Sequence, residues 1–223
     1  MNRKPIEKTV VAALSTLLLT PAAGRAEDSS LQRVLNAHCR ARANIVSLEA
    51  KFVQTRIFTL FEETETSRGE FLFSQPDKIG WFYTEPDRSS TVINGETGWT
   101  VLPHIQQIQK FRLEGSNTNR VLAIVGFGRC ETPLTDSFDV SLANGDDGYH
   151  TLVLEPTDKA ITPYFDRIEL FLDREDFLPR KIELHEKSGD IMVFEFSHLD
   201  RNADIDPERF EYAVPEGYTV VEY

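Results

Sequence analysis

Residues 69–87 carry the clearest fold signal, and they read GEFLFSQPDKIGWFYTEPD. Apolar side chains occupy every second position on both sides of the turn residues 75–77, a period typical of half-buried β-strands. The positions that share this apolar face are Phe71, Phe73, Ile79, Trp81 and Tyr83. A second turn signal at 85–87 ends the stretch, so it predicts an antiparallel hairpin that continues into further strands.

The same alternation, interrupted by closely spaced turn residues, recurs along most of the chain. The predicted strands cover 45–54, 69–73, 79–84, 90–93, 99–102, 105–112, 138–142, 149–155, 165–173, 178–186 and 191–199. Two helices accompany them. The first is an amphipathic helix capped by Asp28 or Ser29, and the second is a short apolar helix around 117–125. We therefore expect a mainly β (α+β) fold, in which about eleven antiparallel strands form a strongly bent sheet or barrel around helices.

Residues 1–26 differ from the rest of the chain. Basic residues at 3, 4 and 8 precede a mostly apolar run from Val10 to Ala23, which is typical of a secretory signal peptide and too short to span a bilayer. Cleavage after Ala26 leaves 20 basic and 35 acidic residues in 197, a charge that disfavours nucleic acid as a partner. We expect residues 27–223 to form one soluble domain outside the cytoplasm.

The two cysteines, Cys39 and Cys130, allow two interpretations. An oxidising compartment favours one disulfide, while two buried thiols are the alternative. Neither cysteine has a second Cys or His at the spacing of a metal site, and the calcium-like run 200–206 lacks the required glycine and glutamate. The sequence predicts no metal and no cofactor.

The sequence contains none of the short motifs that mark the common enzyme classes. The chain has no nucleophile elbow, no metalloprotease helix motif and no phosphate-binding loop, and its five histidines are scattered. We expect a protein that is not an enzyme. A catalytic triad assembled from distant segments is compatible with any sequence order, so an extracytoplasmic hydrolase stays open as an alternative.

The ordered set of motifs resembles the LolA family of periplasmic outer-membrane lipoprotein carriers. The resemblance covers nearly the whole chain after residue 26. It rests on 48–55 (LEAKFVQT), 69–81 (GEFLFSQPDKIGW), Pro86, 92–95 (VING), Trp99, 106–109, Leu178-Pro179 and Pro215-x-Gly217. The resemblance implies an unclosed β-barrel whose helices form a lid over an apolar cavity for lipoprotein acyl chains.

Positions in the matched motifs assign residues to that cavity. The predicted wall consists of Leu48, Phe52, Phe71, Phe73, Ile79, Trp81 and Tyr83 from strands, with Leu122, Val125 and Phe127 from the lid helix. An ordinary β-barrel core presents the same alternating aromatics, so both interpretations stay open at this point.

One position departs from the family pattern. The family places a lid-latching arginine immediately before the motif's proline, and here that position holds Gln75. Glutamine supplies no fixed charge and no five-donor fork, so a latch of the family's type would be weaker or built differently. A disulfide between Cys39 and Cys130 would instead constrain the lid covalently.

The resemblance implies carriage of acylated lipoproteins from the inner to the outer membrane by a periplasmic monomer. Its implied partners are an inner-membrane lipoprotein exporter and an outer-membrane acceptor. A related periplasmic protein of LolA or RseB type that binds or senses another lipid is the first alternative, and the hydrolase is the second. Because a sensor of that type needs an additional domain, the length of this chain favours the carrier.

Overall fold

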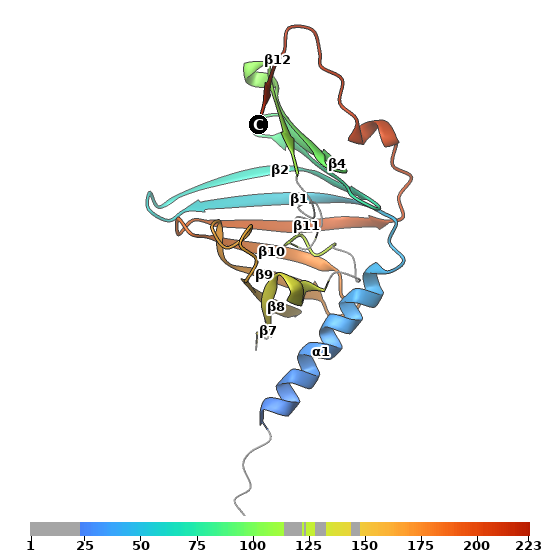
Figure 1. Ribbon diagram of the computed structural model, residues 1–223, viewed down its shortest axis with the longest axis vertical. Coiled ribbons are helices and arrows are strands. Elements are labelled where there is room, and N and C mark those ends of the chain that lie inside the picture. Colours follow the sequence, from blue (N-terminus) through green and yellow to red (C-terminus); the bar gives the residue numbers. More distant parts are fainter. Residues whose placement is uncertain (1–22, 114–121, 123, 128–132, 144–147) are drawn as a thin grey trace, which may run out of the picture.

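One twelve-stranded sheet dominates the computed structural model, which describes residues 23–113, 122, 124–127, 133–143 and 148–223. The strand order is β12-β6-β5-β4-β3-β2-β1-β11-β10-β9-β8-β7, and the sheet ends at β12 on one side and β7 on the other. The strands are β1 (Ser47–Phe58), β2 (Glu63–Ser74), β3 (Lys78–Glu85), β4 (Ser89–Asn94), β5 (Thr97–Leu102), β6 (Gln107–Arg112), β7 (Phe138–Leu142), β8 (Tyr149–Pro156), β9 (Phe165–Asp173), β10 (Pro179–Glu186), β11 (Ile191–Arg201) and β12 (Thr219–Glu222). The expected unclosed, mainly antiparallel barrel is confirmed (Figure 1).

Eleven of these strands correspond to the eleven predicted from the alternation. The twelfth, β12, pairs parallel with β6 and was not predicted, because four residues are too few to display a period. Parallel pairing there covers an edge of the sheet that would otherwise present unpaired backbone groups. Ile105 was predicted to begin a strand but lies in the short helix η1 (Pro103–Ile105).

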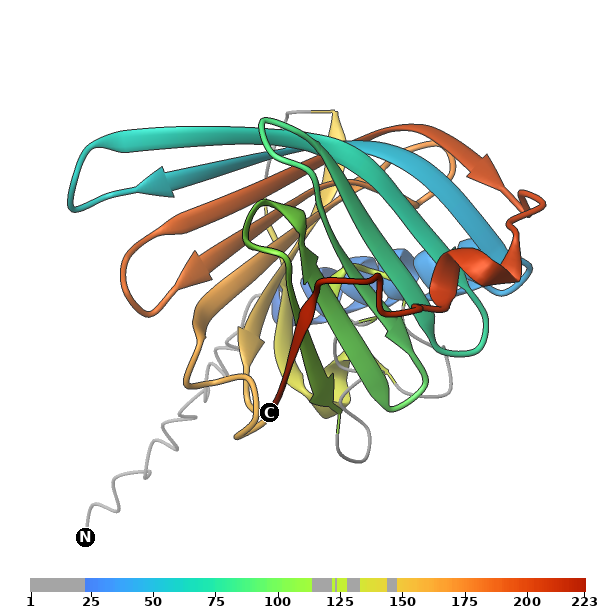
Figure 2. The ribbon, with the colours of Figure 1, turned by 90° about the horizontal axis from the view of Figure 1, so that it is seen from above.

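The sheet curves strongly around its concave face, as Figure 2 shows. Register shifts interrupt the pairing of β1 with β11 at Glu49/Lys51 and of β2 with β3 at Arg68/Gly69. Such irregularities bend a strand and increase its twist. At Gly69 an added Cβ would stand 2.1 Å from the backbone oxygen of Phe82, so the bend there requires glycine.

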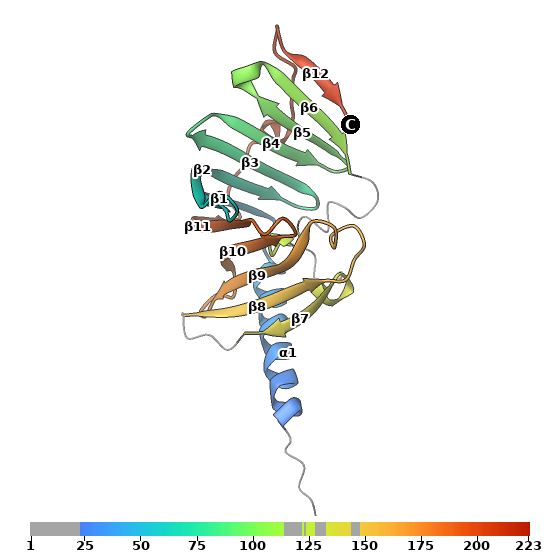
Figure 3. The same ribbon diagram turned by 90° about the vertical axis from the view of Figure 1, so that its left-hand side faces the viewer.

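Helix α1 (Ala23–Arg42) runs beside the β7–β11 half of the sheet (Figures 1 and 3). The prediction that it begins at Asp28 or Ser29 is wrong, because alanine, arginine and glutamate before those positions also favour a helix. Of the predicted second helix, Leu122 and Ile124 are helical and Val125–Gly126 form a turn, while 117–121 and 123 lie outside the described residues. No helix within the described residues has the length and apolar character needed to span a membrane.

The two faces of the sheet bury different side chains. Phe71 and Phe73 enter the main core on the concave face, whereas Leu72 between them packs on the convex face with Val92 and Phe210. Phe210 comes from the short helix η3 (Pro207–Phe210), which lies over β3 and β4. The C-terminal segment therefore covers the outside of the sheet, and α1 and residues 122 and 124–127 cover the inside.

Candidate functional site

All ten predicted wall residues gather on the concave face. Eight of them are fully or almost fully buried in one cluster, and Trp81 and Tyr83 pack against it half-buried. The buried eight are Leu48, Phe52, Phe71, Phe73, Ile79, Leu122, Val125 and Phe127. Residues from strands β1 to β3 thus meet residues 122 and 124–127, which we call the lid segment.

Phe127 is the lid side chain that enters the aromatic interior. Its ring stacks on Phe71 at 5.8 Å between centroids and on Phe73 at 5.9 Å. Phe71 in turn contacts Trp81 at 5.0 Å and Phe196 at 5.5 Å. The lid segment therefore supplies one ring to the packed apolar cluster on the concave face.

Three further interior residues were not assigned to the site from the sequence. Phe194 and Phe196 of β11 lie beside the predicted wall, with Phe194 5.9 Å from Phe52, and Leu170 belongs to the same cluster. Their signal was present, because 191–199 and 165–173 alternate as regularly as 69–73 does. The sequence does not reveal that β1 pairs with β11. That pairing places Phe194 and Phe196 beside the residues of the first hairpin.

Two wall residues bring polar groups into this apolar interior. Burial raises the pKa of Tyr83 to about 12, so its hydroxyl stays neutral at any physiological pH. The indole Nε1 of Trp81 is enclosed and has no hydrogen-bond partner among the described residues. An enclosed donor without an acceptor is costly.

Gln75, at the family's latch position, holds a different part of the chain. Its side-chain Nε2 donates to the carbonyl oxygen of Ile45 at 2.8 Å, and its backbone N–H donates to Val46 at 2.8 Å. Both bonds fix the turn between α1 and β1. The contact with the lid segment comes from Arg42, whose Nη1 donates to the carbonyl oxygen of Gly126 at 3.3 Å.

Gly126 is placed so that only glycine fits. Its φ is +78°, and an added Cβ would stand 2.5 Å from Cγ of Pro179 in β10. The lid segment therefore packs its backbone directly against the sheet and offers its carbonyl to α1. A backbone N–H···O bond of 2.8 Å from Phe127 to Leu122 closes the turn.

His38 and Arg42 lie one helical turn apart on the buried side of α1. The Nδ1 of His38 donates to the carbonyl oxygen of Phe177 at 2.8 Å, and its Nε2 is enclosed without a partner in the described part of the chain. Burial, and then the charge of Arg42, lower the pKa of His38 to about 3, although the bond to Phe177 opposes this. His38 is therefore neutral and Arg42 is the charged member of the pair.

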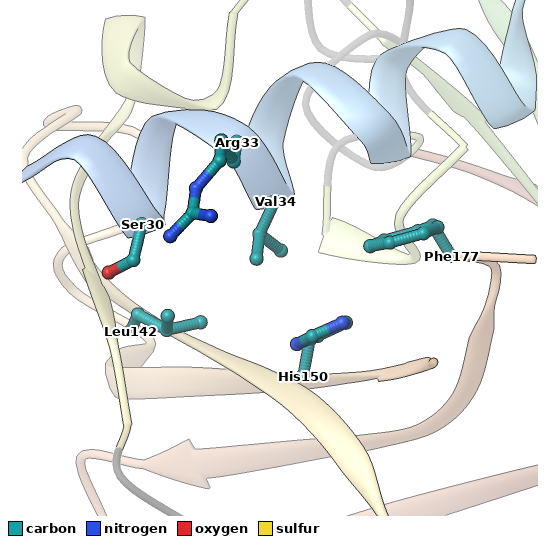
Figure 4. A pocket seen from close by; sticks show the side chains of 6 residues that line it. All are labelled: Ser30, Arg33, Val34, Leu142, His150 and Phe177. Atoms are coloured by element: carbon teal, nitrogen blue, oxygen red, sulfur yellow. The ribbon is translucent and has the colours of Figure 1, made fainter. Parts of the chain in front are cut away.

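A solvent-open pocket of about 330 Å³ lies beside α1 and is lined by Phe177, the hydrogen-bond partner of His38 (Figure 4). Its lining residues are Ser30, Arg33, Val34, Leu142, His150 and Phe177. The ring of Phe177 stacks on His150 at 5.0 Å, and burial, with a smaller effect of Arg174, lowers the pKa of His150. Phe177 separates the pocket from His38, because its ring faces the pocket while its carbonyl binds His38.

One group within the described residues has the composition of a metal site. Glu169, Glu183 and His185 bring their ligand atoms within 4.8 Å of one another. Each carboxylate already has a cation, with Arg167 at 2.8 Å from Glu169 and Lys181 at 2.9 Å from Glu183. The arrangement is a cross-strand ion-pair network on the outer face, and it offers a divalent cation little net attraction.

Cys39 is disulfide-bonded in the structure. Cys130, the other cysteine of the sequence, lies outside the described residues. Their pairing stays a prediction. Since Cys39 stands between His38 and Arg42 on α1, the bond originates from the same part of the helix that contacts the lid segment.

The geometry defines a class of protein: a single curved sheet whose apolar concave face is closed by a helix and a short lid segment. The family described as outer membrane lipoprotein carrier protein LolA matches residues 43–213. This chain belongs to that family.

Similar proteins include an outer-membrane lipoprotein carrier protein of Alkalilimnicola ehrlichii, 28% identical over 179 residues that cover 80% of this chain and 79% of the relative. Another of the same name, from Cupriavidus taiwanensis, is 26% identical over 219 residues and covers 98% of this chain and 99% of the relative. A solved structure of an uncharacterized conserved protein from Thermus thermophilus shares the fold with a TM-score of 0.54. That match has 16% identity and covers 87% of this chain and 99% of the other.

Proposed function

We propose that this protein carries acylated lipoproteins through the periplasm from the inner to the outer membrane, with the acyl chains enclosed on the concave face of the sheet. Membership of the lipoprotein carrier family supports this role, as does the apolar cluster that the lid segment covers. Among the described residues, a 3.3 Å hydrogen bond from Arg42 joins that segment to α1. The predicted leader 1–26 directs the chain to that compartment. Carriage rather than catalysis is the proposed task.

Physical chemistry accounts for the need for a carrier. Each methylene moved from water into an apolar interior gains about 0.8 kcal/mol, so an acyl chain of roughly fifteen methylenes gains about 12 kcal/mol. Without a carrier, exposing such a chain to water would add the same free energy to the barrier for transfer between membranes. An enclosed apolar interior removes that opposition, provided that it opens at modest cost.

The single observation that carries the proposal is the position of Phe127. Its ring lies between Phe71 and Phe73 among side chains that the family motifs assign to the cavity wall. We propose that an entering acyl chain replaces this ring when the lid segment moves outward. The walls would then contact the guest as they now contact Phe127.

The acidic surface of the chain bears on its partners. After removal of 1–26, acids exceed bases by 15, which favours encounter with positively charged surfaces on an exporter and an acceptor. Complementary charge of this kind raises the association rate more than the affinity, as transient hand-over requires. A monomer suits that sequence of encounters.

The test is to purify the protein natively from the periplasm and identify what it carries by mass spectrometry. Recovery of acylated lipoproteins supports the proposal, recovery of a different lipid favours a related lipid-binding role, and recovery of neither contradicts carriage.

Binding of a hydrophobic fluorescent probe tests the wall assignment. Ile79→Glu and Trp81→Glu should abolish binding while circular dichroism shows the fold intact. Ile105→Glu, at an exposed position, is the matched control and should bind like the wild type. Unchanged binding in both wall variants would contradict the assignment.

A further inference from the structure

Arg42 is a half-buried charged side chain that has no counter-ion among the described residues. It makes one hydrogen bond there, to the carbonyl oxygen of Gly126, at a distance of 3.3 Å. Its Nε is enclosed and unpartnered within the same part of the chain. Burial lowers the pKa of Arg42 to about 10, so the guanidinium is still charged at neutral pH.

It is unfavourable to remove a guanidinium from water while one of its donors has no hydrogen-bond partner. Removal of a charge from water is compensated only when partners satisfy its donors. The enclosed Nε of Arg42 has no partner in the described part of the chain, and the bond of its Nη1 is near the long end of the normal range. The C-terminal end of α1 offsets part of the cost, because cations are favoured there. A charge with a shifted pKa and an enclosed donor that lacks a partner is a candidate binding group.

The surroundings of Arg42 connect it to the aromatic interior. Gly126, which accepts its hydrogen bond, is followed directly by Phe127, and Phe127 stacks on Phe71. Phe71 then contacts Trp81, whose indole Nε1 is another enclosed donor without a partner in the described part of this face. His38 does not supply a donor, because its Nδ1–H faces Phe177 and its neutral Nε2 can only accept. The described interior therefore offers unsatisfied donors.

An acyl linkage supplies the missing group. The carbonyl oxygen of an ester or amide accepts hydrogen bonds, and it sits at one end of the apolar chain that the proposed carrier encloses. We propose that Arg42 binds the acyl carbonyl oxygen of the cargo, and that the carbonyl of Gly126 occupies that place while the lid segment is closed. The inference rests on the proposed function and adds to it the residue that recognises the polar end of the acyl group.

The exchange gives Arg42 two roles that alternate. In the empty protein it binds the lid segment through Gly126, and in the loaded protein it binds the cargo. Opening then replaces one carbonyl partner by another, so the guanidinium is never left without an acceptor. A cargo without a carbonyl would lack this compensation, which makes the polar linkage a determinant of selectivity.

Two probes of equal chain length separate this role from simple burial. One is a pyrene-labelled long-chain fatty acid methyl ester, and the other is the corresponding pyrene-labelled alkane. Affinities are measured by fluorescence for the wild type, Arg42→Met, Arg42→Lys and the matched control Arg40→Met, in which an exposed arginine of the same helix is replaced. Because loss of the Gly126 contact alters access of both probes equally, the ratio of ester to alkane affinity is the readout.

The wild type should prefer the ester by at least about tenfold, as expected for a hydrogen bond from a charged donor. Arg42→Met should abolish the preference, Arg42→Lys should retain part of it, and Arg40→Met should leave it unchanged. Equal ratios in the wild type and Arg42→Met would overturn the inference while leaving carriage intact. If the wild type binds neither probe, the proposed function fails and the inference fails with it.

Thermal unfolding verifies the fold of each variant, and Arg42→Lys keeps the test valid should the methionine variant not fold.

Discussion

The neutral state of His38 makes the stability of the protein depend on pH in a defined window. Burial lowers the pKa of His38 from its ordinary value of 6.5 to about 3 in the folded state. Between these two values the unfolded chain binds a proton that the folded chain does not. Stability is therefore fully present above pH 6.5 and falls as the pH is lowered toward 3.

The size of this effect follows from the shift. One pKa unit corresponds to about 1.36 kcal/mol, so lowering the pH from 7 to 5 should remove about 2 kcal/mol of unfolding free energy through His38 alone. The many carboxylates titrate in the same pH range, and their effect on the unfolding free energy must be subtracted. Comparison with His38→Gln removes it, because the glutamine amide can still donate to Phe177 but does not titrate.

Urea unfolding at pH 7 and pH 5 measures the difference. The loss of unfolding free energy between the two pH values should be about 2 kcal/mol smaller in His38→Gln than in the wild type. The control His104→Gln, at an exposed position, should lose as much as the wild type. Identical pH dependence in all three proteins would refute the argument, since His38 would then bind its proton equally in both states.

Further measurements address the lid, the disulfide and the two faces of the sheet. Phe127→Ala should destabilise the protein by about 3–5 kcal/mol and raise the affinity for a hydrophobic probe, because the stacked ring no longer fills the interior. Phe210→Ala, on the convex face, should cost a similar amount in urea unfolding and leave probe binding unchanged. Replacing Cys39 and Cys130 by serine should remove about 4–5 kcal/mol by the chain-entropy estimate, and two free thiols in the denatured, unreduced wild type would exclude the bond. A series of acyl chains should show a length threshold for binding, measured by displacement of the probe.

The sequence predicted the sheet well because each strand displays its own period. Phe71 and Phe73 identify the inner face of β2 without any knowledge of its neighbours, and the other predicted strands were found in the same way. Pairing between distant strands leaves no such local mark, so the position of β11 beside β1, which places Phe196 against Phe71, needed the structure. The short strand β12 was beyond local prediction for the same reason.

The sequence named apolar residues of the candidate site but not its charged residue. Positions in the matched motifs gave the ten apolar side chains, which the structure brings together in one cluster. Their contact with a lipid stays a prediction. The role of Arg42 was missed, although His38 and Arg42 follow Val34 at intervals of four on the buried stripe of α1. A charge on an apolar stripe indicates either a helix end or a binding group, and only the position of Gly126 shows which backbone it meets.

The energy needed to move the lid segment outward sets how tightly the proposed carrier would hold its cargo. Moving Leu122, Val125 and Phe127 from the interior into water costs about 1.5–3 kcal/mol for each side chain, or about 5–9 kcal/mol together. An entering chain gains about 0.8 kcal/mol per methylene, so roughly 6–11 methylenes are needed before binding becomes favourable. A chain of roughly fifteen methylenes exceeds this threshold by only about 3–7 kcal/mol, which corresponds to dissociation constants from millimolar to about ten micromolar. On the proposed function, short molecules would therefore not bind, and a long acyl chain would be bound weakly enough to pass to an acceptor that encloses it better.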